Sequence, residues 1–333
     1  MALVKYIGKK KASKGAPLLT AVSETALLSL WHGASIMDNN NNNTYVATIG
    51  FFDGVHQGHK YLIRQVKDEA KERGMKSMVV TFPTHPRKVL HADYQPALLT
   101  TCDEKVALLR REGVDEIVLM PFTCELSQMS AREFMQKLHS DYGVDVLVIG
   151  YDHRFGHDRS EGFDDYVRYG KDMSMDVVQA LEEPDGIFSS TVVRNALVDG
   201  DVEGANAVLG YPYFMQGNVV GGYHVGTQLG YPTANIQVDV DKLVPKDGAY
   251  AVRVRVADRE YVGMLNIGVR PTLNNGTNRS IEVHILDFDG DLYGKSICME
   301  FFKFIRKEQK FDSIDSLRAQ LKEDESVCRQ LFR

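Results

Sequence analysis

Between a β-branched run and a helical segment, the chain reads Gly50-Phe51-Phe52-Asp53-Gly54-Val55-His56-Gln57-Gly58-His59. The run before it, 45–49, is typical of a buried strand, and residues 60–73 have apolar side chains at helical spacing. A strand that passes through a glycine-rich turn into a helix is where an open α/β sheet binds phosphate, because free N–H groups and the helix dipole point at the anion. His56 and His59 share one face of the first helical turn, and both could donate hydrogen bonds to phosphate oxygens. The stretch predicts a nucleotide site that suits a nucleotidyl transferase.

Two other interpretations of the stretch stay open at this point. Strand–glycine–helix junctions are common, and a histidine pair is often a surface feature or a hydrogen-bonded part of the core. Histidines three residues apart can also bind zinc, but no third ligand is evident. The four cysteines, Cys102, Cys124, Cys298 and Cys328, form no C-x-x-C pair.

The composition is that of a soluble globular protein. The chain has 333 residues, 44% of them hydrophobic and 25% charged, which is enough for two domains with their own cores. The net charge of −6 argues against a nucleic-acid partner, because no basic excess replaces counterions. Scattered cysteines fit a reducing, cytoplasmic compartment. No apolar run approaches the roughly 20 residues that span a bilayer, so no membrane partner is expected. Weak self-association stays open.

Residues 1–43 differ from the rest of the chain. Several lysines between positions 9 and 14 form a basic patch, and the mildly apolar segment 21–31 is interrupted by charge and serine, unlike a cleavable signal. The asparagine run 39–43 is typical of a flexible joint. We expect an N-terminal extension of unassigned role, either dispensable or with a short helix before a linker.

From Thr44 the pattern alternates strand and helix. Apolar strands that alternate with helices predict a parallel sheet with helices on both faces and right-handed crossovers. We expect a first domain at 44–210. Its expected strands are 45–49, 77–82, 116–120, 144–149 and 176–180, and its expected helices are 60–73, 103–112, 131–142, 163–171, 190–199 and 202–209.

After Gly210 the residue composition and the pattern of turns change. Residues 213–308 are rich in Val, Tyr, Ile and Phe, and turns with glycine or asparagine recur, for example at 274–276. Short strands at regular spacing, with no helical stretch among them, predict an antiparallel barrel. One amphipathic helix, 314–331, follows the strands. We expect a second domain at 211–333.

Two more polar clusters occur in the first domain. Gly150-Tyr151-Asp152-His153-Arg154-Phe155-Gly156 follows the fourth strand, at the sheet edge where ligands bind. There Asp152 could hold a ribose hydroxyl or a metal, and Arg154 could reach a triphosphate. Ser189-Ser190-Thr191-Val192-Val193-Arg194 opens a helix, whose hydroxyl and N–H groups could hold the β- and γ-phosphates while Arg194 neutralises the leaving group. The alternatives are a solvated loop with an ion pair and ordinary helix capping.

The second domain carries the segment 226–235, which reads GTQLGYPTAN. Thr233 and Asn235 alternate with Ala234, so their side chains share one face of a strand. A hydroxyl and an amide carbonyl are neutral oxygen ligands that suit Mg²⁺ when ATP phosphates already balance its charge. Glu282 could act as a general base from inside a barrel mouth. The alternatives are the plain start of a strand and an exposed edge-strand glutamate.

Together these motifs resemble the prokaryotic bifunctional riboflavin kinase/FAD synthetase family over about residues 44–330. In the first domain, G-x-F-D-G-x-H-x-G-H, G-x-[DN]-x-x-F-G and S-S-T-x-x-R match 50–59, 150–156 and 189–194, and T-F-x-P-H-P matches 81–86 with Thr84 in place of proline. In the second domain, the P-T-A-N segment, 245–250, 266–272 and 282–294 follow the family order. Class I aminoacyl-tRNA synthetases share H-x-G-H, but the K-M-S-K-S loop that accompanies it there is absent from this sequence.

The resemblance implies a Rossmann-like nucleotidyltransferase domain with a parallel sheet, then a six-stranded antiparallel barrel with a C-terminal helix. It implies that the barrel phosphorylates riboflavin to FMN and that the first domain adenylylates FMN to FAD, with ATP and Mg²⁺ in both steps. The catalytic residues would be His56, His59 and Glu282. ATP in the first domain would contact Gly50, Phe52, Asp53, Gly54, Gly58, Asp152, Arg154, Ser190, Thr191 and Arg194. In the barrel, ATP and Mg²⁺ would contact Gly226, Gly230, Pro232, Thr233 and Asn235, of which Thr233 and Asn235 would be metal ligands. The flavin would contact Asn266, Gly268, Pro271, Thr272 and Arg306.

Some positions depart from the residues usual in that family. They are Phe51, His153 and the pair 227–228, where Thr-Gln stands in place of Gly-Arg. These departures leave open an enzyme with only one of the two activities. A flavin-binding regulator without catalysis is a rival of another class, against which the intact His56, His59 and Glu282 argue. A turnover assay separates these hypotheses.

Overall fold

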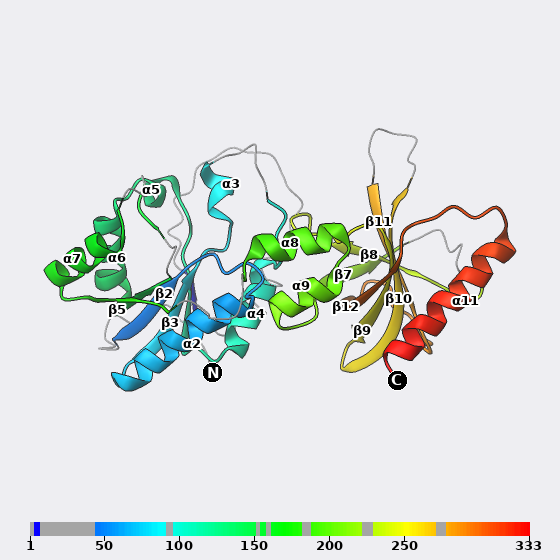
Figure 1. Ribbon diagram of the computed structural model, residues 1–333, viewed down its shortest axis with the longest axis horizontal. Coiled ribbons are helices and arrows are strands. Elements are labelled where there is room, and N and C mark those ends of the chain that lie inside the picture. Colours follow the sequence, from blue (N-terminus) through cyan, green and yellow to red (C-terminus); the bar gives the residue numbers. More distant parts are fainter. Residues whose placement is uncertain are drawn as a thin grey trace. The chain divides into compact units, whose positions relative to one another are not determined.

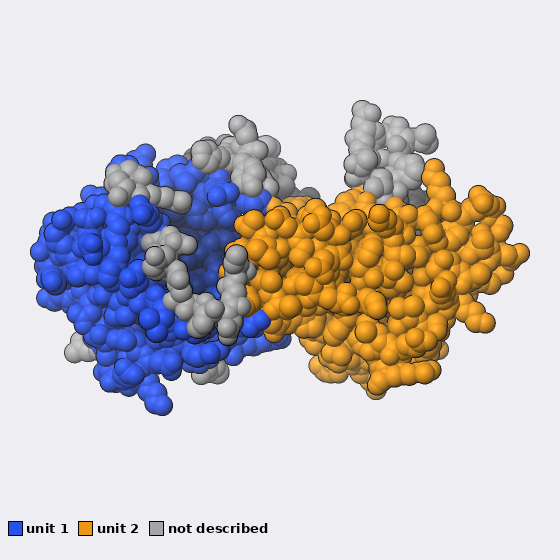
Figure 2. All heavy atoms as spheres, in the orientation of Figure 1, with its two compact units in different colours: residues 1–96, 102–186 blue, residues 97–101, 187–333 orange. Residues whose placement is uncertain are grey.

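A parallel sheet and a closed barrel, both expected from the sequence, lie in two different units of the computed structural model (Figures 1 and 2). Unit 1 comprises Met1–Pro96 and Cys102–Gly186, and unit 2 comprises Ala97–Thr101 and Ile187–Arg333. The structure describes residues 3–6, 44–90, 96–150, 154–157, 161–181, 188–221, 229–270 and 278–333.

The sheet of unit 1 has the strand order β1-β4-β3-β2-β5-β6, and all neighbouring strands are parallel. The strands are β1 (Leu3–Tyr6), β2 (Tyr45–Ile49), β3 (Lys76–Thr81), β4 (Glu116–Leu119), β5 (Val144–Ile149) and β6 (Asp176–Gln179). The five strands β2 to β6 confirm the expectation. The edge strand β1 was not expected, because its four residues lie in the segment that the sequence analysis set apart as an extension. The short helix considered there falls on residues 7–43, outside the described residues.

The chain's path across the sheet reverses at β2. From β2 the chain continues to β3 and β4 on one side, while β5 and β6 lie on the other side. In open α/β sheets, ligands bind beside such a strand, in the crevice outside the carboxyl ends. The turns that follow β2, β3 and β5 all begin at this edge, and they carry three of the sequence motifs.

Helices cover both faces of the sheet (Figure 1). On one face, Val66 and Ala70 of α2 pack against Val46, and on the other face Phe134 and Leu138 of α6 pack in the cluster that contains the β2 residue Ile49. The helices are α2 (Gln57–Glu72), α3 (Pro86–Leu90), α4 (Cys102–Arg111), α5 (Cys124–Ser127), α6 (Ala131–Tyr142) and α7 (Phe163–Met173). The short helices α3 and α5 escaped prediction, because one helical turn shows no periodicity.

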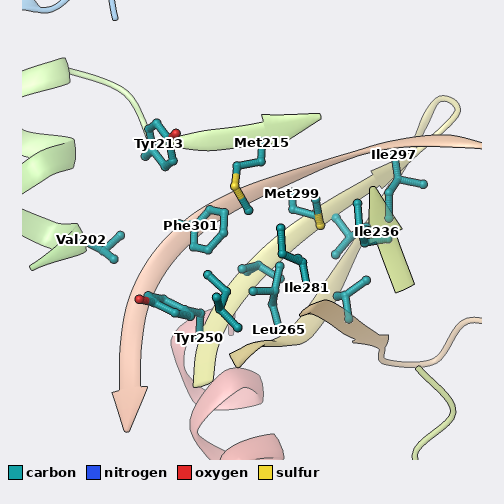
Figure 3. Close-up of a cluster of buried hydrophobic side chains, with 14 of the residues drawn as sticks. Val202, Tyr213, Met215, Ile236, Tyr250, Leu265, Ile281, Ile297, Met299 and Phe301 are labelled. Atoms are coloured by element: carbon teal, nitrogen blue, oxygen red, sulfur yellow. The ribbon is translucent and has the colours of Figure 1, made fainter. Parts of the chain in front are cut away.

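Six antiparallel strands of unit 2 close a barrel in the order β10-β11-β8-β7-β12-β9, as expected. The strands are β7 (Phe214–Val220), β8 (Ala234–Val238), β9 (Gly248–Val256), β10 (Arg259–Arg270), β11 (Asn278–Ile285) and β12 (Ser296–Arg306). Alternate residues of each strand point inward and fill the interior with side chains such as Met215, Leu265, Ile281, Met299 and Phe301 (Figure 3).

Within the described residues of unit 2, the helices beside the barrel are α8 (Ser190–Asp199), α9 (Val202–Leu209) and α11 (Ile314–Leu331). The apolar sides of α8 and α9 belong to the same buried cluster as the barrel interior, and α11 packs along β9 and β10 (Figure 1). The segment 97–101 also belongs to this unit, since Lys242 Nζ donates a hydrogen bond to the Leu99 carbonyl at 2.7 Å. By packing, the barrel's unit therefore comprises Ala97–Thr101 and Ile187–Arg333. The division between residues 210 and 211 was based on the motifs and on the change in residue composition. It stays a prediction of which part of the chain carries which activity.

Candidate active sites

The turn after β2 has an unusual backbone. Phe52, Gly54 and Val55 have φ angles of 54°, 79° and 38°, which lie in the left-handed region. This conformation costs free energy for a bulky residue and most of all for β-branched Val55, so the surrounding structure must hold it. The turn delivers His56 to the N-cap position of α2, beside the N–H groups of the first helical turn.

The two histidines contact each other at this helix start. His56 is 5% exposed, and its Nδ1 accepts a hydrogen bond from the backbone N–H of His59 at 3.4 Å. The rings stack with their centroids 3.7 Å apart. Burial, together with the neighbouring His56, lowers the pKa of His59 well below its ordinary value, so His59 is neutral near pH 7. Among the described residues, the buried Nδ1 of His59 has no hydrogen-bond partner, as expected of a group that meets a ligand.

A buried lysine that the sequence analysis did not single out lies behind this turn. Lys105 of α4 donates hydrogen bonds from Nζ to the carbonyls of Phe51 and Phe82, at 3.0 and 2.7 Å. The same Nζ lies 3.9 Å from the centroid of the Phe51 ring. On a helix in sequence, a lysine reads as a surface residue. Its burial depends on the two turns that meet it, which periodicity does not reveal.

The loop after β5 is anchored by its phenylalanine and glycine. The Phe155 ring stacks on Tyr166 at a centroid distance of 4.2 Å, and the Phe155 N–H donates to the Tyr166 hydroxyl at 3.2 Å. Gly156 has φ +97°, and a Cβ atom there would lie 2.9 Å from the Ala131 backbone nitrogen. These contacts hold the exposed Arg154 at the edge of the sheet. Asp152 lies outside the described residues.

The third motif of the first domain opens α8 and belongs to unit 2. Ser189 is the N-cap, and its hydroxyl accepts from the Val192 N–H at 3.3 Å, so the capping interpretation holds for this residue. Ser190 and Thr191 occupy the first turn, and Arg194 Nε donates to the Ala97 carbonyl at 3.1 Å. The histidine pair and this motif are therefore parts of different units.

In the barrel, three polar residues stand in one row across adjacent strands. Glu282 of β11 is directly opposite Asn235 of β8 on one side and Asn266 of β10 on the other. Directly opposite residues share a face of the sheet. The Thr233 hydroxyl, just before β8, donates to Glu282 Oε2 at 3.3 Å. Because Ile281 and the alternate residues after it fill the interior, Glu282 lies on the outer face. The expectation that it points into the barrel mouth is wrong.

A cavity of about 260 Å³ adjoins this row. Thr233 and Asn235 line it, together with the segment 288–293, which includes Asp289 and Asp291. This volume is slightly below the roughly 300–1,000 Å³ that is typical of small-molecule sites. The sequence analysis used 282–294 for the resemblance without assigning these two aspartates a role. Residue type alone does not show that this turn folds back over the Thr-Ala-Asn strand.

The segment before β8 is fixed from two directions. The carbonyl of Pro232 lies 2.7 Å from His284 Nδ1 on β11, and the Tyr231 hydroxyl donates to Glu325 of α11 at 3.1 Å. Gly230 has φ +82°, which requires glycine or costs strain. These contacts hold Thr233 beside Glu282. Gly226, farther back in the same motif, lies outside the described residues.

Comparison with known proteins covers both halves of the chain. Residues 38–192 match the FAD synthetase family model, and residues 209–332 match the riboflavin kinase model. A Listeria monocytogenes protein named bifunctional riboflavin kinase/FMN adenylyltransferase is 36% identical over 289 residues, which cover 86% of this chain and 92% of that protein. The chain belongs to the bifunctional riboflavin kinase/FMN adenylyltransferase family. An Escherichia coli member of the same name is 37% identical over 291 residues, with the same two coverages.

The chain is also similar to a solved structure over most of its length. A chain from Streptococcus pneumoniae, titled as a macrolide-efflux protein, has a TM-score of 0.80 and 33% sequence identity, over 88% of this chain and 96% of that one. Within the described residues, none of the helices combines the length and apolar character that crossing a membrane requires.

One departure from the riboflavin kinase/FMN adenylyltransferase family pattern has a clear environment. The Phe51 ring lies between the Lys105 ammonium and the His85 ring, whose centroid is 4.5 Å away. Phe51 therefore belongs to the packing behind the histidine turn. The other departures, His153 and the pair 227–228, lie outside the described residues.

The residues that the sequence analysis assigned to the flavin of this riboflavin kinase family are only partly described. Asn266 stands beside Glu282, and the Glu308 carboxylate lies against the Cα of Gly268, where a Cβ would be 2.0 Å from Glu308 Oε1. Arg306 pairs with Asp324 of α11 through N–H···O bonds of 2.8 to 3.1 Å. Its flavin contact stays a prediction. Pro271 and Thr272 lie outside the described residues.

Proposed function

We propose that this chain makes FAD from riboflavin in two steps, at two sites. In the first step, riboflavin and ATP give FMN and ADP. In the second step, FMN and ATP give FAD and pyrophosphate. The observation that carries the proposal is the pair of clusters in different units: a carboxylate beside neutral oxygen ligands in the barrel, and a stacked histidine pair at a helix start.

The barrel row suits phosphoryl transfer to an alcohol. Glu282 is the general base that accepts the proton of the riboflavin 5′-hydroxyl as its oxygen attacks the γ-phosphorus of ATP. Thr233 and Asn235 offer a hydroxyl and an amide oxygen beside that carboxylate, a donor set that fits Mg²⁺ carried by ATP phosphates. Bound there, Mg²⁺ would neutralise phosphate charge. The adjoining cavity supplies room for part of the nucleotide.

The histidine turn suits nucleotidyl transfer. An FMN phosphate oxygen attacks the α-phosphorus of ATP, and the bond to the pyrophosphate oxygen breaks. His56 and His59 donate hydrogen bonds to the phosphate oxygens on which charge accumulates, assisted by the N–H groups at the start of α2. Backbone at Gly50, Gly54 and Gly58 allows a close approach of the nucleotide.

The remaining assignments rest on the sequence motifs. Phe52, Asp53, Asp152 and Arg154 contribute to ATP binding beside the histidines. Ser190, Thr191 and Arg194 hold β- and γ-phosphates in the adenylylation step. Residues 44–210 form the adenylyltransferase domain and residues 211–333 the riboflavin kinase domain. The partners are small molecules, and the free cysteines fit a cytoplasmic location.

A crossover experiment tests the two-site assignment. Glu282→Gln keeps an oxygen that can accept from Thr233 but cannot take a proton, so FMN formation should fall by roughly 10²- to 10⁴-fold. That variant should still convert added FMN to FAD. His59→Ala should accumulate FMN from riboflavin and Mg-ATP. Chromatography of flavins after timed incubation measures both steps, and the unaffected step of each variant is the control.

Two outcomes would contradict the assignment. If both variants lose both activities while circular dichroism shows them folded, the sites are not separate. If the wild-type protein binds flavin but converts neither riboflavin nor FMN, the hypothesis of a flavin-binding regulator is favoured over that of an enzyme.

A further inference from the structure

Lys105 ties together two turns of the unit that carries the histidine pair. Its side chain is buried, with 1% of the residue exposed, and it reaches from α4 to the carboxyl edge of the sheet. Nζ donates to the Phe51 carbonyl in the turn after β2 and to the Phe82 carbonyl in the turn after β3. Thr81 Oγ1 also donates to the Phe51 carbonyl, at 3.1 Å. One carbonyl thus receives two bonds immediately before the left-handed residues.

The strained turn needs such an anchor. Phe52 and Val55 hold φ angles of 54° and 38°, and such residues keep these angles only where neighbouring groups over-determine the backbone. The Phe51 carbonyl accepts its hydrogen bonds directly before Phe52, the first left-handed residue of the turn. The turn ends at His56, the N-cap of α2. Release of the carbonyl would let the turn relax and would move the N–H groups that face the phosphate.

Charge adds a second role to the anchor. The Lys105 ammonium interacts with the Asp53 carboxylate in the same turn and with the Cys102 thiol on its own helix, and its positive charge helps to lower the pKa of His59. The Phe51 ring, which also contacts His85, faces the ammonium as a cation–π partner. The nearby titratable groups are therefore Asp53, Cys102, His59 and His85.

We propose that Lys105 is a positioning residue for FMN adenylylation, which holds the phosphate-binding turn against the neighbouring turn and supplies a buried positive charge behind it. The inference rests on the proposed adenylyltransferase function of unit 1. Lys105 acts through the Phe51 carbonyl and the field at the turn.

Burial supplies the pH signature of this role. It lowers the pKa of Lys105 to about 8, so the group is charged at pH 7 and loses its proton as the pH rises through 8. A neutral amine keeps fewer donors and no charge. FAD formation should then decline about tenfold for each pH unit above 8, while riboflavin phosphorylation in the barrel should not follow this titration.

The test compares Lys105→Met, Lys105→Arg and the control Lys67→Met in the full chain. Lys67 of α2 also donates to a backbone carbonyl, that of Glu112, at 2.7 Å, but away from the turn. FAD formation from FMN and Mg-ATP is measured from pH 6.5 to 9.5, with riboflavin phosphorylation measured on the same samples. Lys105→Met should lose roughly 100-fold in FAD formation at pH 7, because small misplacements at a reacting centre have effects of that size.

Lys105→Arg carries a charge that persists above pH 9, so it should restore most activity at pH 7 and remove the decline above pH 8. Lys67→Met should match the wild type. The proposal is overturned if Lys105→Met stays within threefold of the wild type at every pH. If the thermal transition shows that Lys105→Met does not fold, the test rests on Lys105→Arg. The proposal is then overturned if FAD formation by Lys105→Arg declines above pH 8 as it does in the wild type. A wild-type protein that forms no FAD at any pH refutes the adenylyltransferase function instead.

Discussion

The ion pair between Arg306 and Asp324 should hold the C-terminal helix on the barrel. The Asp324 carboxylate is 3% exposed and the Arg306 side chain 19%, and the two groups share three N–H···O bonds. Gln320 also donates to Asp324, at 3.0 Å. Asp324→Asn preserves shape but removes the charge, which leaves a largely buried guanidinium without its counterion.

The magnitude follows from the burial of the pair. Breaking a fully buried pair costs about 3–5 kcal/mol, and the residual exposure of Arg306 reduces this to roughly 2–4 kcal/mol. For a unit of this size, about 1 kcal/mol corresponds to a shift of 2–4 °C, so the melting temperature of unit 2 should fall by roughly 5–15 °C. Differential scanning calorimetry of the full chain measures this shift.

A second pair on α11 provides the matched control. Arg329 binds Asp287 through two bonds of 2.7 and 2.9 Å, but the side chains are 40% and 73% exposed. Asp287→Asn should change the melting temperature little, because water screens exposed pairs and asparagine tolerates the φ of 57° at this position. Equal melting of Asp324→Asn and the wild type would refute the reasoning. If Arg306→Lys instead has the melting temperature of the wild type and a raised riboflavin KM, the result favours a role of Arg306 in flavin binding.

Two further predictions concern unit 1. Gly156→Ala should lower FAD formation and spare riboflavin phosphorylation, since a Cβ at φ +97° meets the Ala131 backbone; a product assay on the folded variant that shows no loss would contradict this. Because burial lowers the pKa of His59, the unfolded state binds the proton first, so unit 1 should lose stability as the pH falls below about 6.5. Urea unfolding at pH 7 and pH 5.5 checks this, and His59→Gln should reduce the difference.

Periodicity was a good guide wherever an element has a long apolar face. The helices expected at 131–142, 190–199, 202–209 and 314–331 have those bounds in the structure. The edge strand β1 is the opposite case, because four residues are too few to show a periodicity, even though three of them are apolar or aromatic. In the sequence, α8 and α9 continue the α/β alternation, but in the structure their apolar sides pack on the barrel core.

Some site residues could also be predicted from the sequence, and others could not. Motif spacing brought out the histidine pair and the barrel residues Thr233, Asn235 and Glu282. Strand register places Asn235 opposite Glu282, and a hydrogen bond joins Thr233 to Glu282. Lys105 escaped notice because its role depends on burial between two turns. Arg306 pairs with a carboxylate within the protein, and its expected flavin contact stays a prediction.

The chemistry of the two acceptors accounts for the different residue types at the two sites. The 5′-hydroxyl of riboflavin is a weak acid, so its attack on phosphorus requires a base, and Glu282 in the barrel row is the residue that we propose for this role. The FMN phosphate is already ionised near pH 7, because the second pKa of a phosphate monoester is about 6. Its attack requires no proton acceptor, only donors for the charge on the phosphates. The histidine pair and the N–H groups at the start of α2 can supply those donors.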